Sequence, residues 1–504
     1  MVLLLFRHYF YDKSVLVFCQ IISLTLYHTS YIIIPVVLNT KDVDIQKGAL
    51  MQQENKMGVM PINKLIISMS LPMIISMLVQ ALYNIIDSMF VAQISENALT
   101  AVSLAFPAQN LMIAVSTGTG VGINASLSRS LGEKHFEKAN QIADHAIFLA
   151  FCSYLAFAIF GICFAETFYR MQTDIPEIIE YGTVYLRICC IFSVGLFFEI
   201  AIERLLQSTG KTFYSMIVQG IGAICNIILD PICIFGLFGV PKMGVAGAAI
   251  ATVSGQIIAA IVGIILNKKK NTEITVSLKN FRPNKHIVSQ IYSVGIPSII
   301  MASIGSIMTF GMNKILIAFS STATAVFGVY FKLQSFIFMP VFGLNNGTVP
   351  IIAYNYGARR PERITKTLKL AILYAVSIMT LGFAAFQLIP DKLLMIFNAS
   401  DLMLEIGVPA LRIISLSFMA AGYGIACSSM FQALGHGMMS LYMSVVRQLV
   451  VLLPAAFILS KVGGLNSVWI AFPVAEISSV ILATVFLSKI YKQKIQPMKT
   501  HTEA

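Results

Sequence analysis

Apolar segments long enough to cross a membrane recur along almost the whole chain, and short polar stretches separate them. A helix of about 20 apolar residues crosses the roughly 30 Å hydrocarbon core of a bilayer. We therefore predict an all-α membrane protein. Its twelve transmembrane helices are expected near residues 64–90, 98–128, 141–165, 183–206, 213–238, 244–267, 287–316, 323–353, 367–389, 408–431, 438–460 and 464–488.

The second half of the chain repeats the first at an offset of 225 residues, without a gap over most of its length. Pairs at this offset include Pro72 and Pro297, Phe106 and Phe331, Gln109 and Gln334, Gly118 and Gly343, Gly122 and Gly347, and Gln207 and Gln432. Near the end the offset shortens to 220, which pairs Gln256 with Glu476. Because each repeat holds an even number of helices, both halves cross the membrane in the same direction. We predict two parallel six-helix lobes with a substrate path in the cleft between them.

The repeat also suggests boundaries. We expect an N-terminal lobe over 57–270, a cytoplasmic linker over 271–286, a C-terminal lobe over 287–490 and a cytoplasmic tail over 491–504. Residues 1–56 form an extension whose apolar stretch would add an odd span, and the polar stretch that follows fits a natural start at Met51 or Met57. We interpret the glycines four residues apart as close helix packing. Pro72 and Pro297 are candidate bends in the first helix of each half.

Composition and charge support this picture. The chain is 57% hydrophobic and 12% charged, whereas soluble domains carry roughly 25% charged residues. The net charge of +12 comes largely from Lys and Arg after the second, fourth, sixth and eighth spans and in the tail. By the positive-inside rule these connections and both core termini are cytoplasmic, and we expect the plasma membrane of a bacterium. The basic residues form no surface for nucleic acid, and no catalytic or metal-ligand motif points to an enzyme.

Few ionisable residues lie inside the predicted helices, and each is a functional candidate because burying it in a membrane is costly. They are Asp87, Glu199, Glu203, Asp230, Lys314, Lys332, Arg447 and Glu476. Glu199 and Glu203 share a helix face near Arg204, which predicts an ion pair. Arg447 is expected to pair with an acid or to face water. Lys332 is a candidate countercharge or a lining residue of the pathway.

Asn226 and Asp230 are four residues apart and therefore share one face of their helix. Their oxygens can ligate one hard cation, and Pro231 leaves the carbonyl of Ile227 without its helical donor, which offers a further oxygen. The alternative is a polar helix end at the extracellular surface, because Asp230 lies shortly before Gly236. The residues alone leave both interpretations open.

The chain resembles the multidrug and toxic compound extrusion (MATE) family over about residues 60–490. The resemblance rests on YNIIDSMFVA at 83–92, RSLGEKHFEKA at 129–139 with its counterpart NYGARRPERI at 355–364, LLQSTGKTFYSM at 205–216, MFQALGHGMMS at 430–440, and NIILDP at 226–231 followed by GVAGAAIATV. It implies a twelve-helix, two-lobed antiporter that exports organic, often cationic, compounds in exchange for Na+ or H+. It also implies a cation site in the N-terminal lobe at Asp87, Asn226, Asp230 and Thr252.

On this basis we expect alternating access by rocking of two lobes, coupled to Na+ or H+ in the N-terminal lobe alone. We expect small organic substrates, the bilayer as surroundings, no other cofactor and no obligate protein partner. Residues expected along the substrate pathway are Tyr83, Phe106, Gln109, Glu199, Glu203, Phe331, Lys332 and Gln334. The alternative is a flippase for a lipid-linked oligosaccharide or another lipid precursor, which would need several basic residues in the cleft.

Overall fold

The computed structural model describes residues 54–279, 281–397 and 399–500, so most of the predicted extension lies outside the described residues. Within them, 10 helices are long and apolar enough to cross a membrane, and two bent helix pairs raise the number to 12 when each is counted as one span. The predicted all-α, twelve-span architecture is confirmed. Each helix overlaps the span predicted for it, and many continue a few residues further at their ends.

The first half contains α4 (Ile62–Ala92), α5 (Glu96–Gly132), α6 (Phe136–Arg170), the bent pair α7 (Pro176–Ile191) and α8 (Val194–Ser208), α9 (Thr212–Phe235) and α10 (Gly244–Lys270). The second half contains α11 (Lys285–Ile317), α12 (Ser321–Gly357), α13 (Pro361–Leu388), the bent pair α15 (Asp401–Ser415) and α16 (Phe418–Ala433), α17 (Gly437–Val445) with the π-helical turn η1 (Val446–Leu452) and α18 (Leu453–Val462), and α20 (Ala471–Ile490). Short helices are α3 (Lys56–Val59), α14 (Pro390–Met395) and α19 (Gly464–Val468), and α20 continues through η2 (Tyr491–Ile495) into α21 (Gln496–Thr500).

The internal repeat is visible in how the helices begin and bend. Ser95 caps α5 and its repeat partner Ser320 caps α12, each by accepting a 3.0 Å hydrogen bond from the third backbone N–H that follows. The two sharp bends, of 43° and 47°, lie in the fourth span of each half. Pro72 and Pro297 instead lie inside α4 and α11, which continue through them as single helices.

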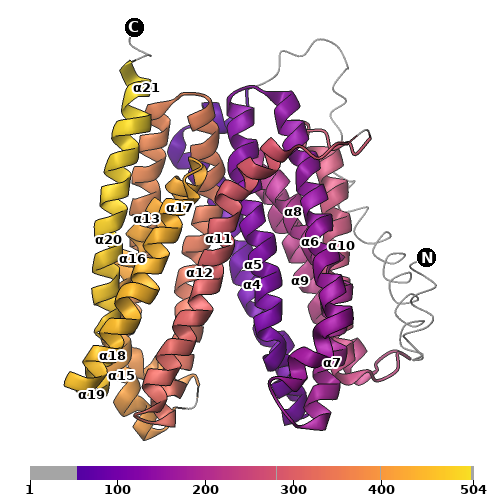
Figure 1. Ribbon diagram of the computed structural model, residues 1–504, viewed down its shortest axis with the longest axis vertical. Coiled ribbons are helices and arrows are strands. Elements are labelled where there is room, and N and C mark those ends of the chain that lie inside the picture. Colours follow the sequence, from indigo (N-terminus) through magenta and orange to yellow (C-terminus); the bar gives the residue numbers. More distant parts are fainter. Residues whose placement is uncertain (1–53, 280, 398, 501–504) are drawn as a thin grey trace.

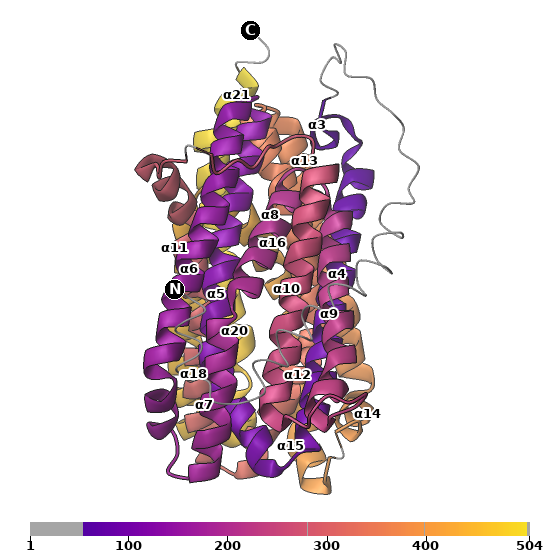
Figure 2. The same cartoon turned by 90° about the vertical axis from the view of Figure 1, so that its right-hand side faces the viewer.

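The helices form two lobes that meet at one end of the molecule and diverge towards the other (Figure 1). We call the upper end in this view, where α3 and α21 lie, the closed end, and the opposite end, with α7, α14 and α15, the open end (Figure 2). The turns after α5, α10 and α12, which the charge pattern predicts to be cytoplasmic, belong to the closed end. The Lys- and Arg-rich connections therefore gather on one side of the molecule.

Glycines bring the two lobes together. A Cβ atom added at Gly118 of α5 would lie 2.8 Å from the backbone nitrogen of Ile299 in α11. At its repeat partner Gly343 of α12, a Cβ atom would lie 2.6 Å from the Cα atom of Ile74 in α4. Gly122 and Gly347 make similarly close approaches to the same two helices. The close-packing interpretation of these glycines is confirmed, and the helices that they join belong to different lobes.

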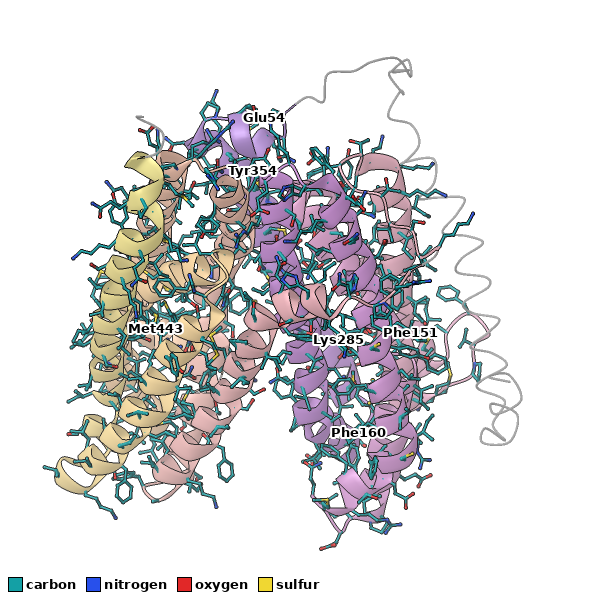
Figure 3. The ribbon with its side chains drawn as sticks, turned by 45° about the horizontal axis from the view of Figure 1, so that its top comes forward. Glu54, Phe151, Phe160, Lys285, Tyr354 and Met443 are labelled. Atoms are coloured by element: carbon teal, nitrogen blue, oxygen red, sulfur yellow. The ribbon has the colours of Figure 1, made fainter. Side chains whose placement is uncertain are left out.

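A short segment, residues 54–60, lies across both lobes at the closed end; we call it the strap. Asn55 donates a 3.0 Å hydrogen bond to the carbonyl of Thr209 and also bonds to Glu273, both on the first-lobe side. From the second lobe, Arg360 donates to the carbonyl of Gly58 at 2.6 Å. Figure 3 shows Glu54 and Tyr354 where the lobes meet. Burial here raises the pKa of the Glu273 carboxyl, and the Asn55 hydrogen bond opposes that shift.

Candidate cation site and substrate cavities

The four residues expected to form a cation site come from three helices and meet inside the first lobe. Asp87 lies on α4, Asn226 and Asp230 on α9, and Thr252 on α10. The amide nitrogen of Asn226 lies 3.3 Å from Asp230 Oδ1 and 3.3 Å from the Thr252 hydroxyl. The carboxyl groups of Asp87 and Asp230 lie near enough to each other to interact electrostatically. The i, i+4 spacing thus places Asn226 and Asp230 together as predicted.

Asn226 and Asp230 are buried, Asp87 and Thr252 are partly buried, and several oxygens of the cluster lack a hydrogen-bond partner within the described residues. Asp230 is 0% exposed and Asn226 is 3% exposed. Asp87 Oδ1, Asn226 Oδ1 and Asp230 Oδ2 are each buried without a hydrogen-bond partner among the residues that the structure describes. Two facing carboxylates repel each other unless positive charge lies between them. Carboxylate, amide and hydroxyl oxygens are also the ligands that hard cations prefer, so the donor set fits a shared proton or a small cation.

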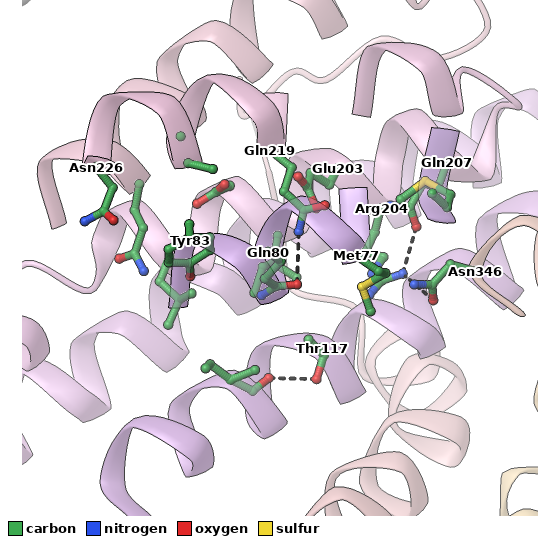
Figure 4. A pocket seen from close by; sticks show the side chains of 18 of the residues that line it. Met77, Gln80, Tyr83, Thr117, Glu203, Arg204, Gln207, Gln219, Asn226 and Asn346 are labelled. Carbon is green, nitrogen blue, oxygen red and sulfur yellow. Dashed lines mark hydrogen bonds between the residues drawn. The ribbon is translucent and has the colours of Figure 1, made fainter. Parts of the chain in front are cut away.

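The cluster opens onto a cavity of about 120 Å³ in the first lobe (Figure 4). Asn226 and Thr252 belong to its wall, so the cluster and the cavity share residues. Glu199 and Glu203 of α8 lie on the same wall. Glu203 is 6% exposed, and its Oε1 atom has no partner within the described part of the chain. The wall therefore carries two acids against one guanidinium group, that of Arg204, and it has an unpaired acceptor, which suits a ligand with positive charge.

The expected ion pair between these acids and Arg204 is wrong. Arg204 instead donates to Gln207 at 2.7 Å and to Asn346 of the second lobe at 3.1 Å (Figure 4). Consecutive residues point about 100° apart around a helix, so the hydrogen bonds of Arg204 are directed to Gln207 and to the other lobe and not to Glu203. This side chain joins the lobes beside the cavity.

A larger cavity of about 510 Å³ lies between the lobes, and Arg204 and Asn346 lie on its border with the first one. Its second-lobe wall includes Arg447 of the turn η1 and Glu476 of α20. Arg447 Nη1 donates to Glu476 Oε1 at 2.6 Å. The prediction that Arg447 pairs with an acid or faces water is confirmed by this ion pair.

Some of the other predicted pathway residues line a cavity, and others do not. Tyr83 lines the first-lobe cavity, and Gln109 lines a small neighbouring pocket and donates to the Tyr185 hydroxyl at 3.2 Å. Phe106 is 63% exposed on α5. Phe331, Lys332 and Gln334 of α12 lie outside the walls of the two larger cavities. Phe331 packs against Phe327, and the Lys332 ammonium lies 5.8 Å from the centre of the Phe397 ring.

Several polar residues of the cavities were not predicted. Gln80 accepts a 3.3 Å hydrogen bond from Gln219 in the first-lobe cavity, where Gln207 also lies. The repeat contained a usable signal, because Gln207 and its partner Gln432 each line the cavity on their own side. This pair of glutamines therefore marked both cavities, whereas the pair Gln109 and Gln334 did not.

Comparisons with known proteins agree with this architecture. A family model described as MatE matches residues 72–232 and 297–458. The multidrug export protein MepA of Staphylococcus haemolyticus is 27% identical over 421 residues, which cover 83% of this chain and 92% of that protein. MepA of Staphylococcus aureus is 27% identical over 417 residues, which cover 82% and 91%.

Solved structures are also similar. An outward-facing multidrug resistance MATE transporter of the MOP superfamily has a TM-score of 0.83 at 26% identity and covers 90% of this chain and 100% of its own. A MOP superfamily transporter from Pyrococcus furiosus, described as having a binding pocket of reverse polarity, has a TM-score of 0.82 at 26% identity, with the same coverage of both chains.

Proposed function

Since the chain belongs to the MATE family of membrane transporters, we propose that it exports organic cations in exchange for Na+ or H+. The curated relatives are described as multidrug export proteins, so the comparisons do not favour the flippase alternative. The observation that carries the proposal is the shared wall between the cluster of unpaired oxygens and the acidic cavity. Two cations that bind in adjoining sites repel each other, which is the physical requirement for exchange.

The coupling cation binds at Asp87, Asn226, Asp230 and Thr252. Either Na+ or a proton places positive charge between the two carboxylates, which otherwise face each other with unsatisfied oxygens. The transported compound binds in the neighbouring cavity, where Glu199 and Glu203 attract its positive charge. Binding of the coupling cation lowers the affinity for the drug, because the two positive charges repel each other in a region of low dielectric constant.

Alternating access follows from the two-lobed shape. The closed end faces the cytoplasm because it carries the Lys- and Arg-rich connections. The packing of the lobes at that end makes this the outward-facing state, from which the drug leaves. Rocking about the cavities exposes them to the cytoplasm, and a differential binding energy of a few kcal/mol is enough to switch such states.

The test is transport of a fluorescent organic cation by proteoliposomes under an imposed Na+ or H+ gradient. The wild type is compared with Asp230→Asn, and Asp174→Asn serves as a control because that acid is exposed in the turn between α6 and α7. We expect one gradient to drive dye movement in the wild type and the control, and not in Asp230→Asn. If neither gradient moves the dye in the wild type, the proposed exchange is refuted.

A further inference from the structure

The second-lobe wall of the inter-lobe cavity carries an ion pair that the proposed exchange does not use. Arg447 and Glu476 line this cavity of about 510 Å³, and their side chains are 27% and 11% exposed. They lie on different helices, 29 residues apart in sequence. The guanidinium group is therefore the more accessible partner and the carboxylate the more buried one.

The pair is incomplete. A guanidinium group has five N–H donors, and a closed pair with a carboxylate usually uses two parallel hydrogen bonds. Within the described residues Arg447 makes one, through Nη1, and Glu476 Oε2 is buried without a partner. Charged groups in a membrane protein are normally paired more fully than this. The remaining donors of Arg447 are thus available to a ligand in the cavity.

The internal repeat shows that these charges are specific to the second lobe. At the offset of 225 residues Arg447 corresponds to Gly222, and at the offset of 220 residues Glu476 corresponds to Gln256. Both counterparts line the first-lobe cavity. Glu199 of that cavity corresponds to Gly424, which lines the inter-lobe cavity. Equivalent walls therefore carry acids in one lobe and an arginine with its own counter-ion in the other.

The backbone around Arg447 is also unusual. Val446–Leu452 form a π-helical turn between α17 and α18, and Arg447 is its second residue. Such turns are rare and are found frequently at functional sites, because the inserted residue changes where the following side chains point. In α9, the repeat counterpart, the same stretch is α-helical. The departure from the repeat thus coincides with the introduced arginine.

We propose that Arg447 is a binding residue for a carboxylate group of transported compounds, and that Glu476 is a positioning residue that holds the guanidinium group in place. This subsite rests on the proposed function, because it lies in the cavity through which the drug would pass. A compound with both charges binds its cationic part at Glu199 and Glu203 and its carboxylate at Arg447. A guanidinium group matches a carboxylate by parallel hydrogen bonds.

The test uses two rhodamine dyes that differ only in one group, a carboxylate that is free in one dye and methyl-esterified in the other. Binding of each to the detergent-purified full-length protein is measured by fluorescence anisotropy. The double variant Arg447→Gln with Glu476→Gln keeps a neutral hydrogen-bonding pair. We expect it to bind the free carboxylate dye about ten- to hundredfold more weakly than the wild type, and the ester equally well.

The single variant Glu476→Gln provides a second readout with the opposite sign. The Gln side chain can still accept the hydrogen bond that positions Arg447 but no longer competes as a negative charge, so the preference for the free carboxylate over the ester should rise several-fold. If neither variant changes the ratio of the two affinities, the subsite is refuted. Transport of the ester dye by the wild type tests the export proposal separately, since the ester has no carboxylate that could bind to Arg447.

Discussion

The glycine contacts between the lobes predict that a single methyl group will shift the conformational equilibrium. In Gly347→Ala, the added Cβ atom of α12 would lie 2.8 Å from the Cα and nitrogen atoms of Ser70 in α4. Ordinary van der Waals contact between carbon atoms requires about 3.5–4.0 Å, so the two helices must separate by several tenths of an ångström or more. Because these two atoms belong to the backbone of α4, rotation of a side chain cannot relieve the contact.

The size of the effect follows from overpacking. Inserting a methyl group into a close-packed interface costs about 1–3 kcal/mol, and the cost falls on the state in which α4 and α12 are in contact. The equilibrium should therefore shift about 5- to 150-fold towards a state with the closed end open. Gly328→Ala is the matched control, because it lies in the same helix and has no atom within 4 Å of an added Cβ. Both variants gain the same helix propensity.

The assay is a distance measurement by electron spin resonance between labels at Glu137→Cys and Glu362→Cys, in a background without the eight native cysteines. These positions are exposed repeat partners at the starts of α6 and α13, one in each lobe. We expect a longer distance to gain population in Gly347→Ala alone. Identical distance distributions in the two alanine variants would show that this contact does not control closure.

Three further predictions concern the cation site and the closed end. Thr252→Val should weaken the apparent affinity for the coupling cation about tenfold in dye transport, whereas Thr252→Ser keeps the hydroxyl and should not. Arg360→Met removes hydrogen bonds to the strap and should raise amide hydrogen exchange of residues 57–60 about tenfold or more, with the exposed Arg359→Met as control. Burial, with smaller contributions from Lys494 and Arg129, lowers the pKa of His436 below 6.5. The closed end is therefore most stable above about pH 6.5 and loses stability as the pH falls. The longer spin-label distance should therefore gain population as the pH is lowered. His436→Gln should weaken this pH dependence.

Local sequence patterns were sufficient for the fold. Hydropathy locates the spans because each helix meets the same apolar solvent along its whole length. The repeat offset predicts two parallel lobes, and it also relates Ser95 to Ser320 and the two bent spans to each other. The i, i+4 spacing of Asn226 and Asp230 predicts that they share a face, because that relation is a property of one helix.

Only the tertiary structure decided which residues from different helices become neighbours. Arg204 leaves the adjacent Glu203 and bonds to Asn346 of the other lobe, and Arg447 finds Glu476 on another helix. The same applies to the approach of α12 to α4 through Gly347. These choices depend on how each helix is rotated and tilted against its neighbours. That rotation is set by packing summed over whole interfaces, so no local pattern of residues contains it.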